Sequence, residues 1–116
     1  MERDPEAFLM DIVEAADAIA DAVRAIDLEE YCHNRLIRSS VEREFIIIGE
    51  ALTQLSRVDA ELFSRVSDAP RIISFRNKIT HEYIKVDDAL VWGFIEKYLK
   101  PLRTLCWSLV EKPNQA

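Results

Sequence analysis

Between Arg76 and Tyr83 the sequence gathers side chains that can bind or cleave a phosphodiester: Arg76, Asn77, His81 and Tyr83. An imidazole has an ordinary pKa of about 6.5, so it can take up or release a proton at neutral pH. An arginine stays charged and can form two parallel hydrogen bonds to phosphate oxygens. Proton transfer combined with charge stabilisation at phosphorus meets the needs of RNA cleavage without a metal ion. These residue types therefore indicate a candidate site of metal-independent RNA cleavage.

The apolar spacing predicts that most of this stretch is a helix with one buried face. After Pro70, three apolar residues fall within an arc of about 60° on a helical wheel. They are Ile72, Phe75 and Ile79. His81 points to the opposite side, with Asn77 one turn before it, and Arg76 lies between the two faces. A helix that buries one side and displays these polar residues on the other is typical of a functional site.

The same residues also have an ordinary structural interpretation. A lone histidine is more often structural than catalytic, and charged residues near a helix end often form surface ion pairs worth at most about 1 kcal/mol. A single histidine also does not readily supply both of the proton transfers that the reaction needs. A symmetric dimer would bring two copies of His81 to one cleft. We assign His33 no role in the site, because its surroundings offer no convergent partner.

The net charge is −6 and the pI is near 4.9, which argues against nucleic-acid binding by broad electrostatic attraction. Basic residues nevertheless cluster around the motif, and Arg71 and Lys78 are candidates for binding or orienting a substrate. The wider set of basic residues is Arg35, Arg38, Arg43, Arg71, Arg76, Lys78 and Lys85. We therefore expect RNA binding at a local patch, weakened steeply by salt.

The cysteines and histidines show no spacing typical of a metal site. Cys32 and Cys106 are far apart and form no zinc-type pattern with the two histidines, so we predict neither a metal nor another cofactor. Cysteines that form neither a disulfide nor a metal site are typical of a reducing cytoplasm, and the N-terminus has no signal-peptide pattern. No apolar run approaches the ~20 residues that a membrane helix needs. We expect a cytoplasmic protein without membrane contact.

The chain of 116 residues with two glycines and four prolines predicts one all-α domain spanning residues 1–116, an antiparallel bundle of four to five helices. Helix starts are expected at Asp4-Pro5, Asp27, Asn34, Asp59, and Asp87 or Asp88. The last helix continues past Pro101, which predicts a kink there.

The long helix expected from about residue 34 to residue 56 carries an apolar run, residues 45–48. Such a segment is either fully buried or covered by another subunit, and we expect it to contribute to self-association. Gly49 costs about 1 kcal/mol relative to alanine inside a helix, so a neighbour is expected to pack closely there. Glu50 follows directly and is either an ordinary exposed acid or a carboxylate near the site.

The run Arg76-Asn77-Lys78-Ile79-Thr80-His81-Glu82-Tyr83 resembles the Arg-x4-His-x-Tyr motif of HEPN-domain toxins of the HepT type. The surroundings agree with the resemblance. The segments 47–51, 86–92 and 101–102 are similar to the family's preceding long helix, its entry to the last helix, and the proline found within that helix. The resemblance covers nearly the whole chain.

This resemblance implies a HEPN-like all-α homodimer whose two motifs line one cleft. It implies a toxin of a type II toxin-antitoxin system, a metal-independent endoribonuclease in which Arg76 and His81 are catalytic and a ribose 2′-hydroxyl attacks. The implied partner is a nucleotidyltransferase antitoxin of the MNT type that adenylylates Tyr83. On an ideal wheel Tyr83 turns toward the buried face, and it reaches the cleft only if the helix ends near Thr80. The alternative function is a non-catalytic helical module that binds a nucleotidyltransferase.

Overall fold

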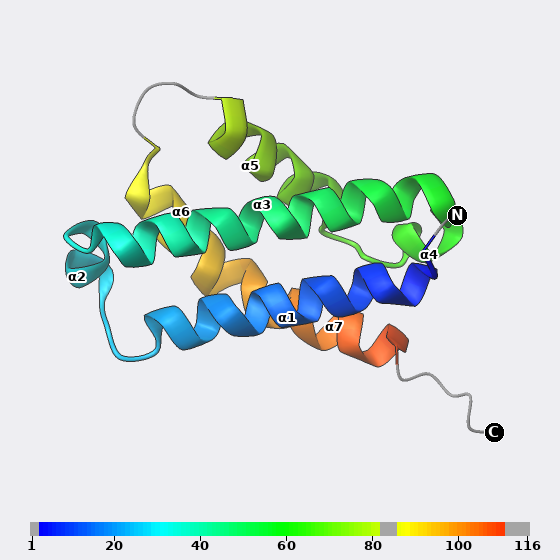
Figure 1. The fold of residues 1–116 in the computed structure, drawn as a ribbon, viewed down its shortest axis with the longest axis horizontal. Coiled ribbons are helices and arrows are strands. Elements are labelled where there is room, and N and C mark those ends of the chain that lie inside the picture. Colours follow the sequence, from blue (N-terminus) through cyan, green and yellow to red (C-terminus); the bar gives the residue numbers. More distant parts are fainter. Residues whose placement is uncertain (1–2, 82–85, 111–116) are drawn as a thin grey trace.

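The computed structural model describes residues 3–81 and 86–110, and all regular structure within these ranges is helical (Figure 1). The elements are α1 (Pro5–Val23), α2 (Leu28–Cys32), α3 (Arg35–Val58), α4 (Ala60–Ser64), α5 (Ala69–His81), α6 (Asp88–Phe94), the π-helix η1 (Ile95–Leu99) and α7 (Lys100–Val110). The prediction of an all-α bundle is confirmed. Its main segments are α1, α3, α5 and the continuous run from α6 to α7, and the one-turn helices α2 and α4 connect them.

Polar side chains at the N-termini explain why most helices begin where they do. The carboxylate of Asp4 accepts a hydrogen bond from the amide of Glu6 at 2.9 Å, with Pro5 in the first turn. Asp27 and Glu30 form a reciprocal capping box at the start of α2. The remaining side-chain caps are Asn34, Asp59 and Asp87, so the expected helix starts are confirmed, with Asp87 rather than Asp88 as the last cap.

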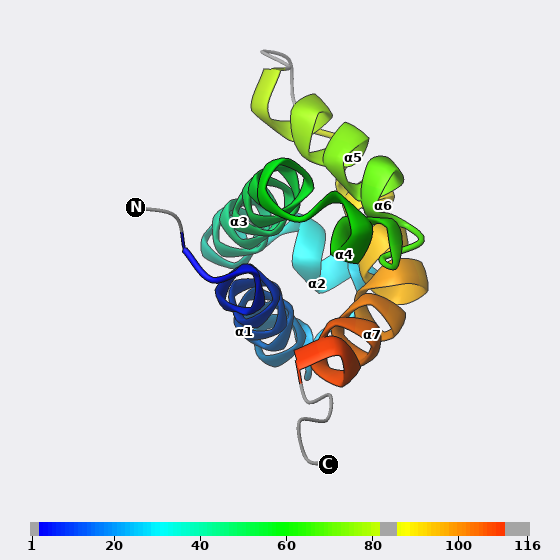
Figure 2. The ribbon, with the colours of Figure 1, turned by 90° about the vertical axis from the view of Figure 1, so that its right-hand side faces the viewer.

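The helices pack around one core, which receives buried side chains from every main segment. Figure 2 shows α1 beside α3 and α7, while α5 lies on the other side of α3 from α1. The core includes Leu9 and Ile12 of α1, Leu52 of α3 and Ile72 of α5. The helix that carries the candidate site therefore packs mainly on α3.

The irregularity expected at Pro101 is a π-helical segment that ends two residues before the proline. Pro101 lacks the amide that would otherwise donate to the carbonyl of Lys97, and a wider turn accommodates such a loss. The helix then continues to Val110, as the apolar period predicted. Of the residues described, none forms a helix both long and apolar enough for a bilayer crossing.

The apolar run of α3 is divided between core and surface. Phe45 and Ile48 are buried in the chain's own core, whereas Ile46 and Ile47 are only partly buried. Ile47 faces α1, where it lines a shallow cavity with Phe8. Part of the run is therefore explained by the fold of one chain, and Ile46 and Ile47 remain available to a neighbour.

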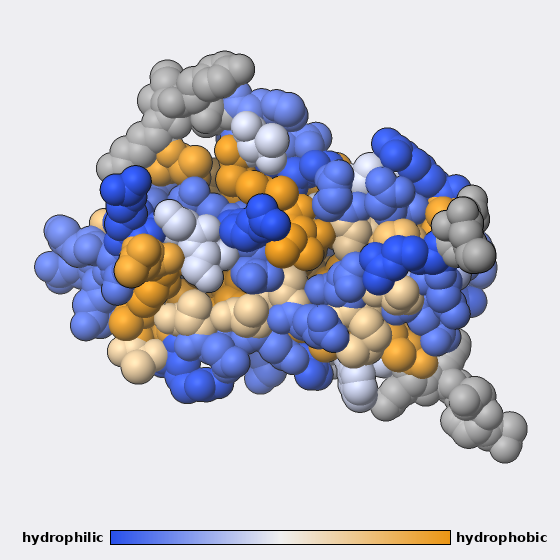
Figure 3. Space-filling model, viewed as in Figure 1, coloured by the Kyte–Doolittle hydropathy of each residue, from blue (hydrophilic) through white to orange (hydrophobic). Residues whose placement is uncertain are grey.

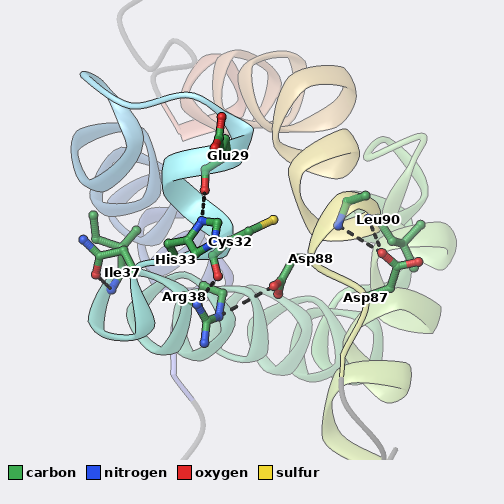
Figure 4. Close-up of polar contacts among 10 residues, drawn as sticks. Glu29, Cys32, His33, Ile37, Arg38, Asp87, Asp88 and Leu90 are labelled. Atoms are coloured by element: carbon green, nitrogen blue, oxygen red, sulfur yellow. Dashed lines mark hydrogen bonds and ion pairs between the residues drawn. The ribbon is translucent and has the colours of Figure 1, made fainter.

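Arg38 joins three helices at the start of α3 (Figure 4). Its guanidinium donates to the carbonyl of Cys32 at 2.6 Å, and its Nε lies 3.7 Å from the carboxylate of Asp88. The ring of His33 makes only a local contact, 2.9 Å from the carbonyl of Glu29. Arg38 thus fixes the start of α6 against α2 and α3 and is not available as a basic surface residue.

Candidate functional site

Helix α5 presents the faces that the sequence predicted. Ile72, Phe75 and Ile79 are buried, whereas Asn77 and His81 are exposed. Phe75 packs edge-on against Phe45 of α3 at 5.1 Å between ring centroids, which holds the helix in place. His81 is the last residue of α5, so its imidazole lies at the surface where the helix ends.

Arg76 lies against α3 over Gly49. An ideal Cβ added at Gly49 would come within 2.5 Å of both Cβ and Cγ of Arg76, so no larger residue fits between the two helices. The close neighbour predicted at Gly49 is therefore Arg76 itself. Glycine at this position lets the arginine stem cross the backbone of α3 and reach its polar edge.

Two side chains of α3 orient the Arg76 guanidinium. Its Nη1 donates to a Glu50 carboxylate oxygen at 3.0 Å and its Nη2 donates to the Thr53 hydroxyl at 3.2 Å. That hydroxyl in turn donates to the carbonyl of Gly49 at 2.9 Å. The Arg76 side chain is only 16% exposed, whereas Glu50 is 58% exposed. The guanidinium is thus held in a shallow cradle, and a phosphate would compete with the exposed carboxylate of Glu50 for it.

Arg76 and His81 leave α5 in different directions. They are five positions apart in the sequence, which corresponds to about 140° around the helix. Arg76 lies on the flank that faces α3, whereas His81 is on the solvent side with Asn77 one turn before it. Within one chain, the two candidate catalytic side chains therefore do not converge on one point.

The other flank of α5 carries Arg71 and Lys78. Both line a groove between α5 and α6, and Arg71 donates a hydrogen bond to the hydroxyl of Tyr98. This hydrogen bond is the main cause that raises the pKa of Arg71 above its usual range. Lys78 is exposed and lies one turn before His81. Tyr83, the expected modification site, lies outside the described residues.

The sequence predicts no functional role for two residues at the site. Thr53 and Tyr98 fit the helical pattern and carry no distinguishing signal. Glu50 was considered near the site, and its contact with Arg76 places it there, although as an exposed acid. In residues 3–81 and 86–110, no three His, Cys, Asp or Glu side chains gather as potential metal ligands.

An all-α bundle whose penultimate long helix ends in an Arg-x4-His segment defines a HEPN-like helical domain. The family model described as "Ribonuclease HepT-like" matches residues 12–108. The chain belongs to this HepT-like family.

Several curated relatives agree with this family. "Putative RNase MJ1380" of Methanocaldococcus jannaschii is 34% identical over 95 residues, covering 82% of this chain and 86% of the relative. "Putative RNase MJ1216" of the same organism is 32% identical over 78% of this chain and 74% of the relative. "Probable ribonuclease HepT" of Thermococcus cleftensis is 26% identical over 89% of this chain and 93% of the relative. No solved structure matches the chain significantly.

Proposed function

We propose that this chain is a metal-independent endoribonuclease and the toxin component of a type II toxin-antitoxin system in the cytoplasm. The observation that carries the proposal is the exposure of His81 at the end of α5, on the same helix as the cradled Arg76. The HepT-like family and the ribonuclease names of its relatives support an RNA substrate. Arg76 and His81 are the proposed catalytic residues, and Asn77, Lys78 and Arg71 the substrate-binding or orienting residues.

The proposed reaction is attack of a ribose 2′-oxygen on the adjacent phosphorus. A base removes the 2′-hydroxyl proton, the new O–P bond forms, and the bond from phosphorus to the 5′-oxygen breaks. The leaving oxygen takes up a proton, and the products are a 2′,3′-cyclic phosphate and a 5′-hydroxyl. His81 moves a proton in this sequence, and Arg76 stabilises the additional negative charge on the phosphoryl oxygens.

A homodimer would resolve the divergence of Arg76 and His81. Because the two side chains leave α5 about 140° apart, Arg76 of one chain and His81 of another can face the same phosphate across a symmetric cleft. Figure 3 shows apolar atoms exposed along the seam between α3 and α5, the flank on which Arg76 lies. Partly buried Ile46 and Ile73 belong to these helices and suit a subunit contact. Light scattering that finds only monomers at micromolar concentration would contradict this arrangement.

The proposed partner is an MNT-type nucleotidyltransferase antitoxin that adenylylates Tyr83. An adenylate group would add bulk and negative charge two residues from His81, where an RNA phosphate otherwise docks. Repulsion between the two anions explains why such a modification would inhibit cleavage. Mass spectrometry after incubation with the nucleotidyltransferase and ATP tests this part of the proposal.

The catalytic proposal is tested by RNA cleavage in EDTA with the purified chain, His81→Ala and Arg76→Ala. We expect each substitution to reduce the cleavage rate by about 10²-fold or more. Thermal melting of each variant separates lost chemistry from lost folding, and Asn34→Ala, which removes a helix cap remote from α5, serves as a destabilised control. Equal cleavage by the wild-type chain, His81→Ala and Arg76→Ala would overturn the proposal.

The alternative is a helical module that binds a nucleotidyltransferase and performs no chemistry. The observation in its favour is that Arg76 is already hydrogen-bonded to Glu50 and Thr53. It predicts no cleavage by the wild-type chain and a stable complex that survives both substitutions.

A further inference from the structure

A groove with a volume of about 530 Å³ lies between α5 and α6, on the opposite flank of α5 from Arg76. Arg71, Ser74 and Lys78 line it from α5, and Leu90 and Phe94 line it from α6. Its volume falls in the range typical of small-molecule and nucleotide sites. The groove combines an apolar floor with polar and basic side chains at its edge.

The floor of this groove is part of a series of stacked aromatic rings. Phe75 stacks on Phe94 with 3.9 Å between centroids and an interplanar angle of 6°. Phe94 in turn contacts Tyr98 at 4.8 Å. Since Phe75 also packs against buried Phe45, the series runs from the core to the surface. Because Phe94 lies between the other two rings, a nucleobase can contact its edge and can stack only on the outer ring, Tyr98, whichever base it is.

Two cations lie at the outer end of the aromatic series, and a third lines the groove itself. Arg71 donates to the Tyr98 hydroxyl, and its guanidinium carbon lies 5.5 Å from the centre of the Tyr98 ring. The ammonium of Lys97 lies 5.5 Å from the same ring centre. Lys78 lines the groove from α5. In a chain with a net charge of −6, this concentration of positive charge complements a phosphodiester backbone.

The groove also leads to the proposed cleavage site. Lys78 and His81 are three residues apart on α5, so their side chains are neighbours on the helix surface, about 60° apart. A strand whose reacting phosphate lies at His81 can therefore place the next phosphate at Lys78 and its base in the groove.

We propose that the groove between α5 and α6 binds one unpaired nucleotide of single-stranded RNA beside the cleaved phosphodiester. Lys78 and Arg71 contact its phosphates, and its base lies against Phe94 and Tyr98. The proposal rests on the proposed ribonuclease function, and it adds that the substrate is unpaired at this position. An acidic peptide would satisfy the cations but would not need the aromatic series.

Binding of a non-cleavable RNA tests this site separately from catalysis. The probe is a fluorescein-labelled single-stranded oligonucleotide with 2′-O-methyl groups on every ribose, measured by fluorescence anisotropy. Tyr98→Leu, which removes the ring, should weaken binding by about tenfold, whereas Tyr98→Phe, which retains it, should stay within about threefold. Melting curves establish that the Tyr98 variants are folded at the assay temperature.

A second pair of variants tests the charge without disturbing the core. Lys78→Glu should weaken binding. It should also reduce the magnitude of the negative slope of log affinity against log salt concentration by about one. Arg24→Glu makes the same change in net charge at the exposed C-terminal cap of α1 and should leave the slope unchanged. Helix α1 lies on the other side of α3 from α5 (Figure 2).

Wild-type affinity in both Tyr98→Leu and Lys78→Glu would overturn the groove as the binding site. Equal affinity for the same RNA in a perfect duplex would contradict the proposal that the bound nucleotide is unpaired. His81→Ala should bind the probe normally while losing cleavage of unmodified RNA. If the wild-type chain binds the probe through the groove but never cleaves RNA, the groove stands and the proposed catalytic function fails.

Discussion

At the scale of single residues, the contact between Gly49 and Arg76 connects fold and site. The guanidinium reaches Glu50 and Thr53 only because α3 lacks a side chain at position 49. This explains a glycine within a long helix, where its lower helix propensity is otherwise a cost. The orientation of the proposed catalytic arginine therefore depends on a residue that carries no chemistry of its own.

Substitution of the two glycines tests this contact. Gly49→Ala should lower the free energy of unfolding by about 1–2 kcal/mol, because crowding against Arg76 exceeds the gain in helix propensity. Gly93→Ala is the matched control, since nothing lies within 4 Å of a Cβ at that position. It should raise the free energy of unfolding by about 0.5–1 kcal/mol. Urea denaturation measures both, and a stabilising Gly49→Ala would show that the helices are not in close contact there.

At the scale of elements, the junction of α2, α3 and α6 contains a carboxyl group that is costly to ionise. Burial, followed by the nearby Asp88 carboxylate, raises the pKa of Glu42, and Arg38 only partly offsets this. The buried ring of Tyr31 packs beside the same junction against Trp92. Since the folded chain holds this proton more tightly than the unfolded chain, the contribution of Glu42 to stability falls as the pH rises above the usual carboxyl range.

Glu42→Gln should therefore stabilise the protein at pH 7, with a rise in Tm on the order of 1–3 °C, and have little effect at pH 4. Thermal melting of variant and wild type across this pH range measures the difference. Glu96→Gln, which changes an exposed glutamate, is the control and should show no such trend. A stabilisation that is larger at pH 4 than at pH 7 would contradict the direction of the pKa shift.

Much of the arrangement of elements could be predicted from the sequence, because capping residues and apolar periodicity are local signals. Asp4, Asp27 and Asp87 each start a helix, and the buried face of α5 follows directly from its apolar spacing. The hydrogen bonds of Arg76 to Glu50 and Thr53 could not be predicted, since they depend on the packing of α5 on α3. The hydrogen bond from Arg71 to Tyr98, beside the groove between α5 and α6, could not be predicted for the same reason, since the two residues are 27 positions apart.

At the scale of the whole molecule, the chain places its two proposed catalytic groups on different flanks of one helix. The guanidinium of Arg76 is held against α3 by Glu50 and Thr53, whereas His81 lies on the solvent side of α5. We therefore propose that a symmetric pair of chains completes each site, with the arginine supplied by one chain and the histidine by the other.

Mixing of two inactive variants tests directly whether the site is shared between two chains. Arg76→Ala and His81→Ala are combined in equal amounts under conditions that allow subunit exchange, and RNA cleavage is followed in EDTA. If the site is shared, half of the dimers contain one intact site of two, so about a quarter of the wild-type activity should return. Native mass spectrometry establishes that mixed dimers have formed. If mixed dimers are present and cleavage stays at the level of the separate variants while the wild type is active, both catalytic groups act within one chain and the shared site is contradicted.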